Sequence, residues 1–142
     1  MAEIISENKP FRLLPALDET NRHFWTGGKS GELIFLRCQE CSYYIHPPSP
    51  RCPGCLTKNL APEAVSGRGI VKTFTIVVHA FNPMVPTPFV LGIVELEEQA
   101  GLQLMTNVIG IQPEEVSIGM PVEVVFEDQG EVFVPLFRPR GA

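Results

Sequence analysis

All four cysteines of this 142-residue chain fall within residues 38–55, as two C-x-x-C pairs separated by ten residues. They are Cys38, Cys41, Cys52 and Cys55. Each pair can place two thiolates on one side of a metal ion, and two pairs complete a tetrahedron. A disulfide pair would use the same thiols, but the cytosol keeps cysteines reduced. Four thiolates close the coordination shell, so we expect a structural zinc that supplies the folding energy of a very small lobe. Spacing alone does not separate zinc from a rubredoxin-type iron.

The remaining residues do not assemble a catalytic set of their own. His23, His46 and His79 lie in three different predicted elements, and we expect His46 to be a loop side chain rather than a fifth ligand. The acidic pairs at 97–98 and 114–115 fit solvated charge at a turn and at a helix start. No G-x-S-x-G sequence or glycine-rich phosphate loop occurs. Whether the chain is an enzyme stays open, and these residues give little support to a free-standing enzyme.

A short helix is predicted just before the cysteine segment. Asp18 or Thr20 can cap a helix that starts near Glu19, and the glycines that follow residue 26 end it. Phe24 and Trp25 give this helix an apolar side. They either pack on the cysteine lobe or dock on another protein, and the sequence favours neither.

Apolar residues recur at every second position from residue 67 onward, which is typical of β-strands. Turn sequences separate five such stretches, and a helical turn is expected after Pro113, between the third and fourth strands. This order favours an OB-type Greek-key barrel. The predicted strands cover residues 69–79, 89–96, 102–108, 121–127 and 132–137.

The expected fold is mainly β: an N-terminal arm and helix (1–35), a four-cysteine zinc ribbon (36–63) and a five-stranded OB-fold barrel (64–142). The apolar runs are too short to cross a membrane, and residues 1–10 have no apolar core like that of a secretory signal. A cytoplasmic protein is therefore expected.

An OB barrel also raises single-stranded nucleic-acid binding as an alternative function. Such binding needs a positive groove and stacking aromatic residues. Here residues 67–142 hold four Lys and Arg against nine Asp and Glu, a net charge of −5. The six phenylalanines of this half alternate as core positions do. We therefore expect no nucleic-acid partner.

Six stretches in this order resemble a known family, the thiolase-associated OB-fold proteins with an N-terminal rubredoxin-like zinc ribbon. The likeness runs from about residue 18 to residue 140. The matching stretches are HFW (23–25), LRCQECSYYIHPPSPRCPGC (36–55), SGRGIVKTFTIV (66–77), PFVLGIVELEE (88–98), GIQPEEVSIGMPVEVVF (110–126) and LFRP (136–139).

The resemblance implies a small accessory subunit of an acyl-CoA complex, beside a thiolase-like large subunit that carries the chemistry. It would serve assembly, stability or formation of the acyl-CoA site. A retro-aldolase or a MaoC-type enoyl-CoA hydratase is the alternative partner. A heterotetramer of two large and two small chains is expected, because thiolases are commonly dimers. The acyl group cannot be predicted.

Two groups of residues are candidate contacts for CoA or for a partner. Cations suit the CoA phosphates, although an ion pair within the chain explains each of them equally well. The proline-rich loop at 80–89 exposes apolar side chains, as interfaces do, unless it folds back onto its own barrel. The candidate contacts are Arg68, Lys72, Arg138 and Arg140 among the cations, and Phe81, Met84 and Val85 in the loop.

Overall fold

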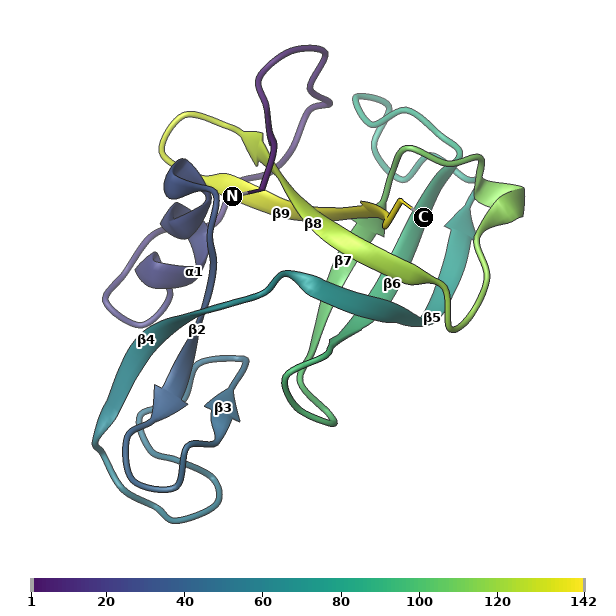
Figure 1. Ribbon diagram of the computed structural model, residues 1–142. Coiled ribbons are helices and arrows are strands. Elements are labelled where there is room, and N and C mark those ends of the chain that lie inside the picture. The colour runs from purple at the N-terminus through teal and green to yellow at the C-terminus, as the bar shows by residue number, and fades with distance from the viewer. Residues whose placement is uncertain (1, 142) are drawn as a thin grey trace.

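The protein is mainly β, with the zinc-ribbon lobe at one end and a barrel at the other (Figure 1). The computed structural model describes residues 2–141. Its strands and helices are β1 (Ile4–Ile5), α1 (Arg22–Thr26), the 3-10 helix η1 (Gly27–Ser30), β2 (Leu33–Cys38), β3 (Tyr44–Ile45), β4 (Leu60–Val65), β5 (Arg68–Val77), β6 (Phe89–Leu96), β7 (Gln103–Val108), the 3-10 helix η2 (Pro113–Glu115), β8 (Pro121–Asp128) and β9 (Phe133–Pro139).

Five strands close the barrel in the order β8-β5-β6-β7-β9, with β9 pairing back onto β8. The predicted helical turn is η2, between the third and fourth barrel strands. Both observations confirm the predicted OB-fold. The closing pair β7–β9 is parallel and has a single register contact, Val108 opposite Phe137. The barrel is therefore joined only narrowly along this seam.

Period-two patterning builds the barrel core as expected. Along β6 every second residue from Val90 to Leu96 is buried, because successive strand side chains point to opposite faces. Phe126 and Phe137 are fully buried at its centre. Phe81 was placed both among phenylalanines that alternate as core positions do and in the exposed 80–89 loop, and its side chain is 85% exposed. β5 ends at Val77, so Phe81 lies in the loop, as the second expectation requires.

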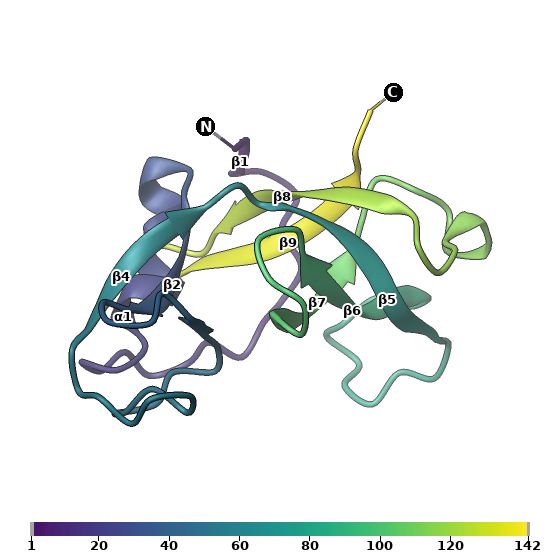
Figure 2. The ribbon, with the colours of Figure 1, turned by 60° about the horizontal axis from the view of Figure 1, so that its bottom comes forward.

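The zinc-ribbon lobe contains a three-stranded antiparallel sheet in the order β3-β2-β4. β4 continues into β5 through a turn at Gly67, so one long, bent ribbon leads from this lobe into the barrel (Figure 2). Gly67 has a φ of +79°, and a Cβ there would lie 2.4 Å from Val124 Cγ1. The junction therefore requires glycine. The division at 63/64 stays a prediction, and β4 runs across it.

The helix is shorter than predicted: α1 begins at Arg22, not near Glu19. The Asp18 carboxylate accepts hydrogen bonds from the backbone N–H groups of Thr20 (2.9 Å) and Asn21 (3.0 Å). These bonds stabilise a turn before the helix, as aspartate side chains commonly do. Asp18, one of the expected capping residues, thus stabilises the turn that precedes the helix. Among the described residues, no helix is long and apolar enough to cross a bilayer.

The N-terminal segment lies on the barrel, which the sequence did not indicate. β1 pairs in parallel with β8, with Ile4 opposite Phe126 and Ile5 opposite Glu127. Only two residues form this strand, too few for a recognisable alternation of side chains. The following chain passes along the barrel before it reaches α1 (Figure 1).

Candidate metal centre and apolar groove

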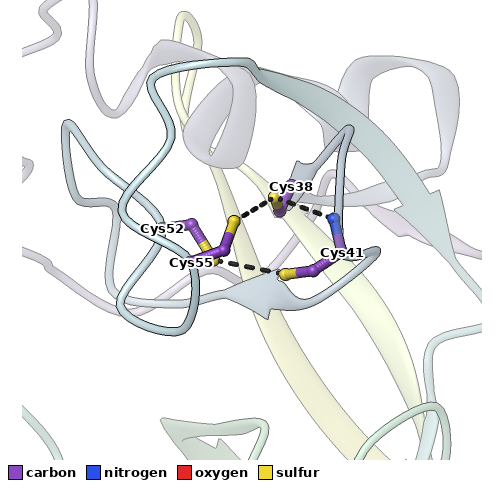
Figure 3. Close-up of side chains that lie close together, drawn as sticks. All are labelled: Cys38, Cys41, Cys52 and Cys55. Carbon is purple, nitrogen blue, oxygen red and sulfur yellow. Dashed lines mark hydrogen bonds between the residues drawn. The ribbon is translucent and has the colours of Figure 1, made fainter.

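The four cysteine side chains converge in the zinc-ribbon lobe (Figure 3). All four Sγ atoms lie within 4.8 Å of one another. The Sγ atoms of Cys38 and Cys55 are 3.5 Å apart, and so are those of Cys41 and Cys52. Tetrahedral zinc with Zn–S bonds of about 2.3 Å would separate its ligands by about 3.8 Å. The donor set and its spacing therefore fit a zinc ion bound by four thiolates.

Backbone N–H groups of the two knuckles point at the sulfur atoms. Cys38 Sγ accepts from Cys41 N at 3.3 Å and from Glu40 N at 3.4 Å, and Cys52 Sγ accepts from Gly54 N at 3.3 Å. The N–H of Cys41 is the main cause that lowers the pKa of Cys38 to about 6. Such donors stabilise thiolates, the form that binds metal. The zinc would hold the two knuckles together, and with four thiolates it would have no open position for substrate.

His46 is not part of this cluster, in agreement with its expected loop role. Its ring packs against both Phe24, at 4.7 Å between ring centroids, and Phe35, at 4.6 Å, and these two rings lie 5.9 Å from each other. Burial lowers the pKa of His46 to about 4, so the ring is neutral near pH 7. The stack joins α1 to the zinc-ribbon lobe. Phe24 is 6% exposed, which favours its packing role over docking on another protein.

An apolar groove of about 650 Å³ lies on the barrel side of α1. Its walls come from residues 10–15, from the loop at 82–88 and from the ends of β6 and β7. Trp25 and Val85, two of the predicted contact residues, both line it. Phe81 and Met84 lie outside it, with exposed fractions of 85% and 62%. The structure thus gathers part of the predicted contact set around one groove.

Arg12 is the one charged side chain that lines the groove among the described residues, and the sequence analysis missed it. Its guanidinium binds both carboxylate oxygens of Glu127, with Nη2 at 3.3 Å from Oε2. Nη1 also donates to Asn107 Oδ1 at 3.1 Å. Glu127 is 3% exposed. Because 115 residues separate Arg12 from Glu127, no local pattern in the sequence indicates the pair.

The four predicted cations of the barrel do not line the groove. Each forms an ion pair within the chain. These pairs are Arg68 with Glu97 (2.7 Å), Lys72 with Glu95 (3.7 Å), Arg138 with Glu123 (3.0 Å) and with Glu3, and Arg140 with Glu97 (3.9 Å). These distances agree with the alternative that the four cations form ion pairs within the chain. A contact between them and CoA stays a prediction.

Known proteins match both lobes. Residues 25–61 match the family described as ChsH2, rubredoxin-like zinc ribbon domain, and residues 62–127 match ChsH2, C-terminal OB-fold domain. A solved structure named Ltp2-ChsH2(DUF35) aldolase superposes with a TM-score of 0.80 and 34% identity, over 89% of this chain and 98% of that chain. The chain belongs to the DUF35 family. The match to a zinc-ribbon family supports zinc as the metal of the four-cysteine site.

Two further relatives differ in length from each other. A DUF35 domain-containing scaffold protein of Methanocaldococcus jannaschii is 38% identical over 96 residues, which are 66% of this chain and 67% of the relative. A probable enoyl-CoA hydratase alpha subunit of Thermomonospora curvata is 35% identical over 137 residues. That match covers 94% of this DUF35 chain but only 42% of the hydratase subunit. The chain thus spans less than half of that relative.

Proposed function

We propose that this protein is a small accessory subunit of an acyl-CoA enzyme complex, in which a larger thiolase-like subunit makes or breaks a carbon–carbon bond beside a CoA thioester. The observation that carries the proposal is the likeness to a chain of the Ltp2-ChsH2(DUF35) aldolase, which this protein covers almost completely. An aldolase breaks or forms carbon–carbon bonds. The same reaction class is therefore the first choice for the partner.

The protein's own residues fit an accessory role. Its four thiolates form a closed metal site, which can fix structure but leaves no coordination position for a substrate. His46 is packed against two phenylalanine rings and has a pKa too low for a general base near pH 7. The partner would supply the nucleophile and the acid–base groups, and this chain would help to assemble or stabilise the acyl-CoA site.

A hydratase partner is the second candidate, because the probable enoyl-CoA hydratase alpha subunit matches 94% of this chain. Nucleic-acid binding has less support, because all four cations of the barrel are already paired with carboxylates. A CoA phosphate bound at Arg68 or Arg138 would have to share that cation with its carboxylate partner.

The test is purification of the tagged chain from its native cells, followed by mass spectrometry and native mass measurement. We expect a complex of two large and two small chains whose large subunit is thiolase-like. Its carbon–carbon lyase or thiolase activity should fall when the small chain is removed and return on re-addition. A hydratase as large subunit would select the second candidate. Thioester turnover by the isolated chain would contradict an accessory role.

A further inference from the structure

We propose that the exposed side chains of the N-terminal arm (9–15) and of the 81–85 loop form one docking surface, which binds an uncharged, apolar surface of the larger enzyme subunit. This inference rests on the proposed function and deepens it, because it assigns the contact to particular residues. We call this the arm–loop surface; its apolar members are Phe11, Leu13, Leu14, Phe81 and Met84.

Large apolar side chains of the arm–loop surface are unusually exposed. Leu13 and Phe81 are both 85% exposed, and Met84 is 62% exposed. Phe11 and Leu14 remain 41% and 46% exposed. Scattered apolar residues are normal on protein surfaces, but these come from two segments that line the same groove. Gathered apolar exposure of this kind marks interaction sites.

The arm is anchored to the barrel through polar groups rather than through its apolar side chains. Arg12 binds the buried Glu127 carboxylate and the Asn107 side chain. Lys9 Nζ donates to the carbonyl of Asp128, and Gln129 Nε2 donates to the carbonyl of Pro10 at 3.5 Å. Phe11, Leu13 and Leu14 make none of these attachments; they line the groove and keep 41%, 85% and 46% of their surface exposed. The arm is thus held in place while its apolar surface stays available.

The charges in the groove indicate what can cover it. The positive charge of Arg12 is neutralised by Glu127. Asn107 is also occupied, since its Oδ1 accepts from Arg12 and its Nδ2 donates to the Val90 carbonyl at 2.9 Å. The groove therefore offers no unpaired charge to a phosphate or a carboxylate, and a charged occupant would lose its hydration without compensation. An uncharged apolar surface matches it.

The extent of the surface favours a protein over a small ligand. An acyl chain inside the groove would contact Trp25 and Val85, which line it. It would leave Phe81 and Met84 in water, because both lie outside the groove and are 85% and 62% exposed. Only a broad protein surface covers the groove and its rim together. A second copy of this chain is disfavoured, since each copy carries a net charge of −5.

The first experiment places a photo-crosslinking phenylalanine analogue at Leu13, at Phe81 or at Ile118 of the full chain, in its native cells. Ile118 is the matched control, because it is 69% exposed yet belongs to neither the arm nor the 81–85 loop. We expect adducts with the larger subunit from positions 13 and 81 and at least a tenfold lower yield from 118. Mass spectrometry of the adducts identifies the partner.

The second experiment measures affinity with the purified large subunit. The double variant Leu13→Ser and Phe81→Ser should bind at least about tenfold more weakly, because truncated apolar anchors at an interface commonly cost that much or more. Ile118→Ser should bind as the native chain does. Circular dichroism and zinc content verify that the variants stay folded, which is expected because both replaced side chains are exposed.

The remaining outcomes separate this inference from the proposed function. Adducts with the large subunit that form equally well or better from position 118 would overturn the arm–loop surface and leave the accessory role standing. Adducts only with a second copy of the chain would overturn the partner assignment. If no position gave an adduct with an acyl-CoA enzyme and none copurified, the inference and the proposed function would both fail. Unchanged affinity of the double variant would also overturn the inference.

Discussion

The zinc-ribbon lobe and the barrel are stabilised in different ways. Around the cysteines, the buried apolar cluster contains only Cys38, Ile45 and Cys52, with Leu36 and Leu60 partly buried beside it. The barrel has a continuous core of valine, leucine and phenylalanine side chains. A lobe with so few buried residues cannot offset the entropy of ordering its chain by apolar burial alone. The metal must supply what the barrel obtains from packing.

The two regions nevertheless share contacts. Phe35 and Tyr44 of the zinc-ribbon sheet belong to the main core cluster together with barrel residues. The Gln99 side chain pairs with the Tyr44 backbone, accepting from its N–H at 2.8 Å and donating to its carbonyl at 3.0 Å. The cysteine end therefore depends on metal, whereas the other end of the same sheet is supported by the barrel.

Loss of the metal should have the largest effect, and it should divide the two regions. In Cys52→Ser, the zinc content should fall from one ion per chain to near zero, and amide exchange should become fast around residues 38–60. Structural zinc contributes about 10 kcal/mol to small zinc-binding folds. The barrel strands should keep their protection from exchange. Ser49→Ala, in the same loop, is the control. Equal loss of protection in β6 would show that the barrel depends on the metal too.

Removal of the ion pair between Arg12 and Glu127, which holds the N-terminal arm on the barrel, should have the second largest effect and should leave the metal bound. Arg12→Met removes the partner of a buried carboxylate, so we expect the free energy of unfolding to fall by about 3 kcal/mol. Urea denaturation measures this change, and limited proteolysis should cut residues 9–15 faster. The salt bridge between Arg68 and Glu97 is exposed, so Arg68→Met should cost much less. A reduced zinc content in Arg12→Met would contradict the separation of the two regions.

The smallest expected effect is a pH dependence of stability caused by His46, which packs at the contact between the two regions. The pKa of His46 is about 4 in the folded protein, whereas a histidine free of the fold has a pKa of 6.5. As the pH falls, the unfolded chain binds the proton first, so stability is lost between about pH 6.5 and about pH 4. At pH 5 the loss is about 2 kcal/mol. His46→Phe should keep the stack and remove this loss.

Urea denaturation at pH 7 and pH 5 measures the difference for both proteins. Acid also weakens metal binding by the cysteines, but it does so in both proteins, so their comparison isolates His46. The pKa of His23 is lowered by burial as well, and His23→Gln should remove a further part of the pH dependence. An identical pH dependence in the native protein and His46→Phe would rule out this role.

Much of the fold could be predicted because its signals are local. The alternation from residue 89 to 96 gave the bounds of β6, and Pro113 marked η2. The helix start was wrong because Asp18 can serve a turn as well as a helix. Phe81 falls in step with the core phenylalanines in the sequence, yet it is exposed as its place in the 80–89 loop predicts, because β5 has already ended at Val77.

The sequence by itself determined the metal site, because two C-x-x-C knuckles ten residues apart can converge without help from distant parts of the chain. It also determined where along the chain the barrel strands lie, because their apolar positions alternate. Only the tertiary structure decided the groove and the arm–loop surface. Both depend on Arg12 meeting Glu127 and on residues 10–15 lying beside the 82–88 loop. Contacts between such distant segments arise from the packing of the whole barrel, which no local pattern of residue types records.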